Sequence, residues 1–352
     1  MRHIERLEQE GIRRLGSPGR GFRYKHANGK PVSAQELERI EALKLPPAWK
    51  DVLISPSATS KLQAMGKDGA GRWQYRYHES FTKRREAEKF QRVVNFARAL
   101  PKLRRRVAAD IRKPGLGRDK VMACLLRILG TCFIRPGSQQ YADENQSFGL
   151  ATLRAKHVKV KGDTIIFDFP GKSGQHQHRE LRDRQVAHVV RECLKVPGRD
   201  VFKFVLDDGF VVDVRRRHIN EYIQEVMGAQ YSAKDFRTWG GTLICACALA
   251  RAKERVRREA EKEGLKVTKK TMVAAVKEVA EHLGNTPAVA RGSYIYPSVL
   301  AMFEKGRVVE RYFESVEELV RHEKPALHCA EKALLDMLED GEVPSAAGRA
   351  SA

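Results

Sequence analysis

The hydrophobic and polar positions at the start of the chain form short segments of mixed character. Residues 33–36 (SAQE) form a capping box, which predicts a short helix over residues 34–44. Residues 43–56 (LKLPPAWKDVLISP) are broken by prolines and then have the pattern of a strand. Tyr75 and Tyr77 alternate with polar neighbours in GRWQYRY, which predicts another strand. This part of the chain therefore combines short strands with a helix.

The rest of the chain is dominated by helical periodicity. Helical patterns cover residues 86–110, 118–134, 183–195, 215–227 and 273–283. A second capping box at residues 232–235 (SAKD) begins a further helix. Gly284 ends the helix predicted over residues 273–283, and Thr286 is the N-cap of another helix that begins with Pro287. Between the helices, residues 150–182 have the pattern of strands, with a hairpin turn at Gly162–Asp163.

These patterns predict an α+β protein. A small amino-terminal domain of β-sheet and helix should precede a mainly α-helical domain that carries a small antiparallel sheet. The length of 352 residues suits two domains, and we expect them to span residues 1–88 and 89–340. The charged segment 251–270 has the pattern of an exposed helix or a linker, and residues 341–352 that of a disordered tail.

The chain is strongly basic, since 66 Lys and Arg residues face 44 Asp and Glu residues and leave a net charge of +22. A charge of this size attracts polyanions from solution. Nucleic acid is the first candidate partner, and charge carried only for solubility is the alternative. A membrane is disfavoured, because the longest apolar runs fall far short of the ~20 residues that span a bilayer. The first residues also lack the apolar core of a signal peptide.

The charge is concentrated in one segment. Residues 83–113 hold 12 basic and three acidic residues, a balance of +9 that begins with Lys83, Arg84 and Arg85. Segregated positive charge is typical of a groove that follows phosphates. Just upstream, Gln74 and Arg76 alternate with two tyrosines, a mixture that suits contact with DNA sugars, phosphates and base edges. The alternative, a sheet edge packed by two tyrosines, stays equally open.

Several polar residues lie where a purely structural role has little use for them. Arg135 ends an apolar helix before Pro136, and Lys172 lies at the boundary between a strand and a turn. Two more lie in the first turns of a helix, Lys234 and Arg237, and three surround the start of another helix, Asn285, Arg291 and Tyr294. Each alone has an ordinary explanation, such as a cap or a surface ion pair. Together they favour phosphoryl transfer, because guanidinium groups match phosphate oxygens, a phenol can act as nucleophile and a lysine can protonate a leaving alkoxide.

The sequence gives no support for a metal or a nucleotide cofactor. His176 and His178 have no acidic or cysteine partner at ligand spacing. No GxxxxGK[ST] loop is present. We therefore expect neither a metal ion nor any other cofactor.

Five segments, taken in order, resemble the type IB DNA topoisomerase family in its compact poxviral and bacterial form. They are GRWQYRY, TCFIRPGSQQYADENQSFGLATLRAKHV, FPGKSG, SAKDFRTWGGT and LGNTPAVARGSYIYPSVL. The resemblance runs from about Gly19 to Tyr312. It implies a DNA-clamping domain followed by a catalytic domain.

The resemblance also implies the role of each site residue. Tyr294 corresponds to the nucleophile that forms a 3′-phosphotyrosine, and Arg135 and Arg237 correspond to the arginines that clamp the phosphate. Lys172 corresponds to the lysine that protonates the 5′-oxygen. Asn285 stands where poxviral and nuclear relatives have histidine, so it can donate a hydrogen bond but cannot carry a proton.

Further residues follow from the same resemblance. Lys234 corresponds to a lysine that assists the second arginine. The expected DNA contacts are Gln74, Tyr75, Tyr77, Tyr141, Lys83, Arg84 and Arg85. Tyr296 should point elsewhere than Tyr294, because two residues on one helix are about 200° apart.

The function implied is ATP-independent relaxation of supercoiled double-stranded DNA by nicking, strand rotation and religation. The enzyme is expected to be a monomer, cytoplasmic and associated with the nucleoid. A site-specific tyrosine recombinase is the first alternative, but recombinases carry HxxR at the second arginine, where this chain has KDFR ending at Arg237. A DNA-binding protein without activity is the second, and it would lack one or more of the four principal site residues.

Overall fold

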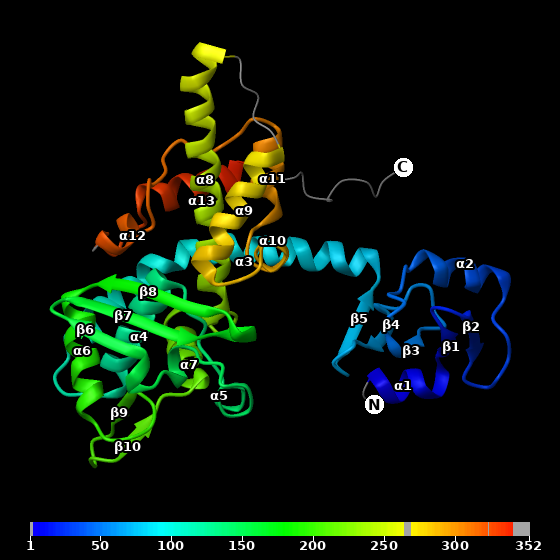
Figure 1. The fold of residues 1–352 in the computed structure, drawn as a ribbon, viewed down its shortest axis with the longest axis horizontal. Helices are drawn as coiled ribbons and strands as arrows, with labels where there is room; N and C mark the ends of the chain where they lie inside the picture. The colour runs from blue at the N-terminus through cyan, green and yellow to red at the C-terminus, as the bar shows by residue number, and fades with distance from the viewer. Residues whose placement is uncertain (1–2, 264–268, 323, 341–352) are drawn as a thin grey trace, which may run out of the picture. The chain divides into compact units, whose positions relative to one another are not determined.

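The computed structural model describes residues 3–263, 269–322 and 324–340, so the expected tail 341–352 lies outside the described residues. The chain divides into two compact units, Met1–Phe90 and Gln91–Ala352 (Figure 1). The division falls within the long helix α3 (Glu79–Asp110), which starts seven residues before the predicted position of 86 and has Pro101 in its interior. Within the described residues, no helix is long and apolar enough to cross a membrane.

The first unit is a five-stranded antiparallel sheet with two helices. The strand order is β2–β1–β3–β4–β5. The strands are β1 (Ile12–Ser17), β2 (Gly21–His26), β3 (Lys50–Ile54), β4 (Leu62–Lys67) and β5 (Trp73–Tyr77), and the helices are α1 (His3–Glu10) and α2 (Ala34–Ala42). The capping box that predicts α2 is confirmed, with Ser33 Oγ accepting from Glu36 N.

Successive residues of β3 pack into two small cores. Leu53 belongs to a cluster with Leu7 of α1, whereas Ile54 belongs to a cluster with Ile40 of α2. Side chains alternate between the faces of a strand. One helix therefore covers each face, and β5 forms one edge of the sheet.

The second unit is mainly helical, and its helix α4 (Arg118–Cys132) is largely buried beside the small sheets (Figure 1). Contacts to α4 come from helices α6 (Arg184–Lys195), α7 (Arg216–Met227) and α8 (Ala233–Glu263) and from strands β8 (His176–Arg182) and β9 (Lys203–Val205). The other long helices are α6 (Arg184–Lys195), α7 (Arg216–Met227), α8 (Ala233–Glu263), α9 (Lys269–Leu283) and α13 (Cys329–Asp340). The short ones are α5 (Gln139–Asn145), α10 (Pro287–Ser293), α11 (Pro297–Glu304) and α12 (Glu317–Arg321).

Two small antiparallel sheets complete the second unit. One has the order β6–β7–β8, with β6 (Val158–Lys161), β7 (Thr164–Pro170) and β8 (His176–Arg182), and the other pairs β9 (Lys203–Val205) with β10 (Val211–Asp213). The hairpin turn at Gly162–Asp163 is confirmed, because Lys161 pairs with Thr164. The α+β prediction is confirmed as well.

Two further details differ from the sequence predictions. Residues 150–152 and 155–157 are 3₁₀ turns rather than strands, because Thr152 Oγ1 and His157 Nδ1 accept hydrogen bonds from backbone N–H groups that a strand would pair. Helix α4 ends at Cys132, since Phe133 takes a left-handed conformation with φ of 51°. Of the helix or linker expected over residues 251–270, the helix is found up to Glu263 and again from Lys269, and residues 264–268 lie outside the described residues.

Candidate active site

Four of the predicted site residues come together where α9 ends. Arg237 lies in the second turn of α8, and Arg135 follows α4. Gly284 ends α9 with a φ of 58°, as the sequence predicts, and Asn285 comes next. Tyr294 is the C-cap residue of α10, the following helix. Segments more than a hundred residues apart in sequence therefore meet at one helix end.

Both arginines bind backbone oxygens at this helix end. Arg237 Nη2 donates to Leu283 O at 2.8 Å, and its Nη1 donates to Phe133 O. Arg135 Nη1 donates to Gly284 O at 3.1 Å, and its Nη2 donates to Asn285 Oδ1. Cations are favoured at the carboxyl end of a helix, where carbonyl groups lack intrahelical partners. These bonds fix the position of both guanidinium groups.

Arg237 and Tyr294 are in direct contact. The guanidinium carbon lies 4.8 Å from the centre of the Tyr294 ring. Arg237 is only 2% exposed. Its pKa is lowered to about 10, first by burial and then by the charge of Arg135. Arg237 still carries its charge at neutral pH, held close to the phenol.

The electrostatic surroundings favour the ionised form of Tyr294. Burial raises the pKa of its phenol, but the charge of Arg237, followed by those of Arg135 and Lys234, brings the pKa below its ordinary value. A phenolate is the nucleophilic form of tyrosine. The cluster can therefore activate Tyr294 without a histidine or carboxylate base.

Two buried nitrogen atoms of this cluster have no hydrogen-bond partner among the described residues. They are Arg237 Nε and Asn285 Nδ2. An unsatisfied buried donor costs about 1–3 kcal/mol, so such groups are rare in the absence of a role. Arg237 contacts Tyr294 and Asn285 binds Arg135, so the cluster holds two donors that the acceptor oxygens of an anion would satisfy.

A pair of glycines in α8 permits the close approach of these segments. A Cβ atom on Gly240 would lie 2.2 Å from the Phe133 ring. One on Gly241 would lie 2.9 Å from Tyr294 O and 3.2 Å from its Cβ. The dipeptide Gly240–Gly241 therefore lets α8 pack against the segment before Arg135 and against Tyr294. The two glycines are visible in the sequence as TWGGT, but their role in close packing can be recognised only when the neighbouring residues are known from the structure.

We expect Gly240→Ala to destabilise the protein by about 1–3 kcal/mol, because the new methyl group overlaps the buried Phe133 ring. Gly130→Ala in α4 is the matched control, since its Cβ would meet nothing closer than Phe236 Cδ1 at 3.9 Å. Thermal unfolding checks both variants. Gly130→Ala should unfold at or above the wild-type temperature, and an unchanged midpoint for Gly240→Ala would contradict the packing argument.

Lys172 and Lys234 are placed less tightly than the arginines. Lys172 opens a 3₁₀ turn (Lys172–Gly174) between β7 and β8 and is exposed. The described hydrogen bonds and ion pairs do not join it to Arg135, Arg237 or Tyr294. Lys234 is exposed in the first turn of α8, and its charge acts on the pKa of Tyr294.

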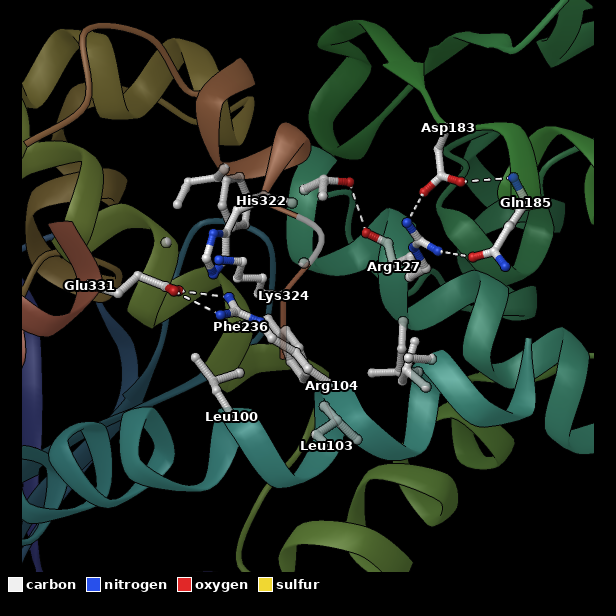
Figure 2. Close-up of a pocket in the computed structure, with 18 of the residues that line it drawn as sticks. Leu100, Leu103, Arg104, Arg127, Asp183, Gln185, Phe236, His322, Lys324 and Glu331 are labelled. Carbon is white, nitrogen blue, oxygen red and sulfur yellow. Dashed lines mark hydrogen bonds and ion pairs between the residues drawn. The ribbon is translucent and has the colours of Figure 1, made fainter. Parts of the chain in front are cut away.

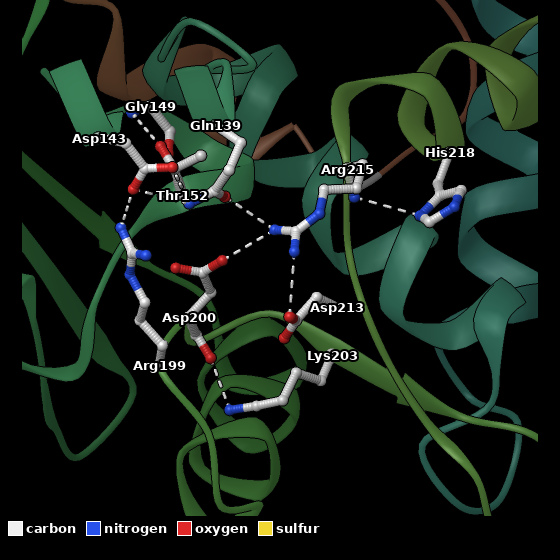
Figure 3. Close-up of polar contacts among 10 residues, drawn as sticks. All are labelled: Gln139, Asp143, Gly149, Thr152, Arg199, Asp200, Lys203, Asp213, Arg215 and His218. Atoms are coloured by element: carbon white, nitrogen blue, oxygen red, sulfur yellow. Dashed lines mark hydrogen bonds and ion pairs between the residues drawn. The ribbon is translucent and has the colours of Figure 1, made fainter. Parts of the chain in front are cut away.

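Tyr141 is exposed on α5, with 58% of its surface accessible. A polar network holds this short helix in place (Figure 3). Arg215 donates to Gln139 at 2.8 Å and to Asp200 at 2.9 Å, and Arg199 pairs with Asp143. Tyr141 therefore lies on a helix that two arginines anchor.

The remaining predicted DNA contacts lie in the first unit, around the edge strand β5. Tyr75 and Tyr77 are exposed, with ring centres 6.2 Å apart, and Phe81 lies 5.2 Å from Tyr77. We call these three rings the aromatic strip. The guanidinium groups of Arg84 and Arg85 lie 5.7 and 5.8 Å from the Phe81 ring. Phe81 is a member that the sequence reasoning missed.

Gln74 and Lys83 complete that set. Gln74 Nε2 donates to Asp68 Oδ2 at 2.9 Å, which ties Gln74 of β5 to the turn before that strand. The side chain of Lys83 lies outside the described part of the chain.

Two interpretations of the sequence need correction. His176 and His178 do have an acidic partner, because β7 pairs with β8 and places Asp168 2.7 and 3.2 Å from them. Among the described residues no group of three such ligands could hold a metal ion. Tyr296 is the N-cap of α11 and does not share a helix with Tyr294, since Pro297 starts a new helix and excludes helical backbone before it.

The second unit also contains a cavity of about 730 Å³ (Figure 2). Its lining includes none of Arg135, Arg237, Asn285 and Tyr294, but it does include Phe133, whose carbonyl oxygen Arg237 binds. Phe236 and Trp239 of α8 line it, as does Glu331, which is 2% exposed. Arg104 donates to both oxygens of Glu331 at 2.8 Å, and Trp239 Nε1 donates at 3.1 Å. This buried network ties α13 to α3 and α8, and so supports the helix that carries Arg237.

Comparison with known proteins identifies a family for most of the sequence. Residues 78–318 match the family described as eukaryotic DNA topoisomerase I, catalytic core, and residues 21–68 match the bacterial DNA topoisomerase IB, N-terminal domain.

Viral proteins are among the relatives. DNA topoisomerase 1B of Acanthamoeba polyphaga mimivirus is 33% identical over 308 residues, which cover 86% of this chain and 90% of the viral one. DNA topoisomerase 1B of vaccinia virus (strain Copenhagen) is 24% identical and covers 77% of this chain and 84% of its own. The cluster around Tyr294 and these matches over most of the sequence lead to one conclusion. The chain belongs to the type IB DNA topoisomerase family.

Proposed function

We propose that Tyr294 is the nucleophile with which this topoisomerase nicks and rejoins one strand of double-stranded DNA. The observation that carries the proposal is the pair of orphan donors, Arg237 Nε and Asn285 Nδ2, beside a phenol of lowered pKa. A phosphodiester supplies the acceptor oxygens that these donors lack. Its negative charge also suits the two guanidinium groups.

The cleavage step exchanges one phosphate ester for another. The phenolic proton leaves to water, and Tyr294 Oη forms a bond to phosphorus. The bond between phosphorus and the 5′-oxygen breaks, and that oxygen takes a proton from Lys172. The product is a 3′-phosphotyrosyl ester and a free 5′-hydroxyl group. The reverse reaction rejoins the strand, so the cycle consumes no ATP.

Each remaining residue of the cluster acts on the charge that develops in the transition state. Arg135 and Arg237 bind the non-bridging oxygens, and their bonds to the end of α9 hold them ready before the substrate arrives. Asn285 donates one hydrogen bond. Lys234 favours the phenolate through its charge. These groups supply the stabilisation, and we propose that no metal ion takes part.

DNA contacts outside the cluster follow the exposed aromatic and basic residues. In the first unit we propose the aromatic strip with Gln74, Lys83, Arg84 and Arg85, and in the second unit Tyr141. Stacking and cation–π contacts bind sugars and bases without demanding one sequence. We propose that residues 1–88 act as a DNA clamp and residues 89–340 as the catalytic domain.

We further propose that the enzyme acts as a monomer in the cytoplasm of a bacterium, associated with the nucleoid. One chain provides every proposed catalytic group. The net charge of +22 favours residence on DNA. Sedimentation of the purified protein checks the monomer, since a dimer would double the mass.

The test is relaxation of negatively supercoiled plasmid with EDTA and without ATP. We expect complete relaxation, because the chemistry needs only side chains. Denaturation with SDS during the reaction should trap protein on the 3′ end of the nick. Activity that needed added Mg²⁺ or ATP would contradict the mechanism, as would attachment to the 5′ end.

A further inference from the structure

Gln177 of β8 lies between two turns that each precede a proposed catalytic residue. It is buried, with 7% of its surface exposed. A Cβ atom on Gly171 would lie 2.8 Å from Gln177 Cγ, and one on Gly284 would lie 2.1 Å from Gln177 Oε1. Gly171 is followed by Lys172, and Gly284 by Asn285. One side chain therefore fills the space between the two turns, and only glycines leave room for it.

The amide group of Gln177 links the same two turns through hydrogen bonds. Its Nε2 donates to Gln175 O, at the end of the turn of Lys172, at 3.3 Å and to His176 O, at the start of β8, at 3.2 Å. Its Oε1 accepts from Arg179 Nη2 at 3.3 Å. The same nitrogen donates to Glu281 O at 3.0 Å and His282 O at 2.9 Å. The path runs from the turn of Lys172 through Gln177 and Arg179 to the end of α9.

The end of α9 is also where the two clamping arginines are fixed. Arg179, Arg237 and Arg135 bind the successive carbonyl oxygens of residues 281–284. Lys172 has no such attachment among the described contacts, and its own turn is closed by the bond from Gly171 N to Gln175 O at 2.8 Å. Among the described contacts, those of Gln177 connect the turn of Lys172 to the end of α9 and so to the two arginines.

We propose that Gln177 is a positioning residue that holds Lys172 at the correct distance from the phosphate bound by Arg135, Arg237 and Asn285. The inference rests on the proposed function, because Lys172 matters only as the proton donor to the leaving 5′-oxygen. Gln177 itself touches neither substrate nor reacting atoms. Its effect should therefore appear in the one step that needs the proton of Lys172.

Two DNA substrates that differ in one atom isolate that step. In one the 5′ leaving atom at the cleavage site is oxygen, and in the other it is sulfur. A thiolate leaves without a proton, since the pKa of a thiol is about 8.5. Single-turnover cleavage of the sulfur substrate therefore does not depend on Lys172, whereas cleavage of the oxygen substrate does.

We expect Gln177→Ala to cleave the oxygen substrate about 10- to 100-fold more slowly than wild type, the range that a misplaced catalytic group causes. On the sulfur substrate its rate should lie within about threefold of wild type, and its affinity for DNA should be unchanged. Lys172→Ala should show the same selectivity, to a larger extent. Gln175→Ala removes an identical but exposed side chain from the same turn and should behave as wild type on both substrates.

Gln177→Met tests the proposal if Gln177→Ala does not fold. It keeps the volume between Gly171 and Gly284 but removes the hydrogen bonds, and we expect slower cleavage of the oxygen substrate with recovery on sulfur. Equal losses on both substrates would overturn the proposal, as would wild-type rates for Gln177→Ala on the oxygen substrate. If the wild-type enzyme forms no covalent complex with either DNA, the proposed function itself fails.

Discussion

Tyr294→Phe is expected to abolish DNA relaxation, with a loss on the order of 10⁴-fold or more, as for other residues that carry a covalent intermediate. The change removes only the attacking oxygen. The ring stays in contact with Arg237, and the backbone of residue 294 keeps its bond from Thr242 Oγ1 at 3.2 Å. Folding and DNA binding should therefore survive. A time course of plasmid relaxation, with SDS trapping of the covalent complex, measures the effect.

Tyr296→Phe is the matched control. It lies two residues away, and its backbone N donates to the same Thr242 hydroxyl at 3.1 Å. As the N-cap of α11 it belongs to a different helix, and we expect this variant to relax plasmid at the wild-type rate. A covalent complex formed by Tyr294→Phe but not by Tyr296→Phe would assign the nucleophile to Tyr296 instead.

The elements of this fold could be predicted where their signals are local. The capping box at Ser33, the glycine end of α9 at Gly284 and the hairpin at Gly162 each depend on a few neighbouring residues. The start of α3 could not be placed in the same way. Residues 79–85 carry no apolar periodicity, but they form the first turns of a helix whose later turns are buried.

The candidate site could be predicted as a set of residues but not as a geometry. Arg135 and Arg237 stand out because cations are unusual beside apolar helices. Their attachment to α9 does not appear in any local pattern, since the partners lie 149 and 46 residues away. For the same reason, the part played by Gln177 and the pairing of Asp168 with two histidines became visible only in the structure.

Arg237→Ala is expected to slow single-turnover DNA cleavage by about 10²–10³-fold at neutral pH, the cost of removing one preorganised donor from a transition state. The guanidinium has two effects that this change removes together. Its Nε is a free donor for the phosphate, and its charge lowers the pKa of Tyr294. Without Arg237 the effect of burial is less opposed, so the pKa of the phenol rises.

The pH dependence separates these two effects. The phenolate forms at lower pH in the wild type, so the rising limb of the rate profile should move to higher pH in Arg237→Ala, and the deficit should shrink as pH increases. Arg237→Lys keeps a positive charge but loses the Nε donor, and its rising limb should stay closer to that of the wild type. Arg258→Ala, at an exposed position on the same helix, should match the wild type throughout.

Stability must be measured beside activity, because Arg237 also holds the oxygens of Phe133 and Leu283. Leaving buried carbonyl groups unpaired costs about 1–3 kcal/mol, so the rates of Arg237→Ala have to be taken well below its unfolding temperature. A deficit that is constant across the pH range would contradict the effect of Arg237 on the Tyr294 pKa. It would leave phosphate binding as the whole contribution of this arginine to cleavage.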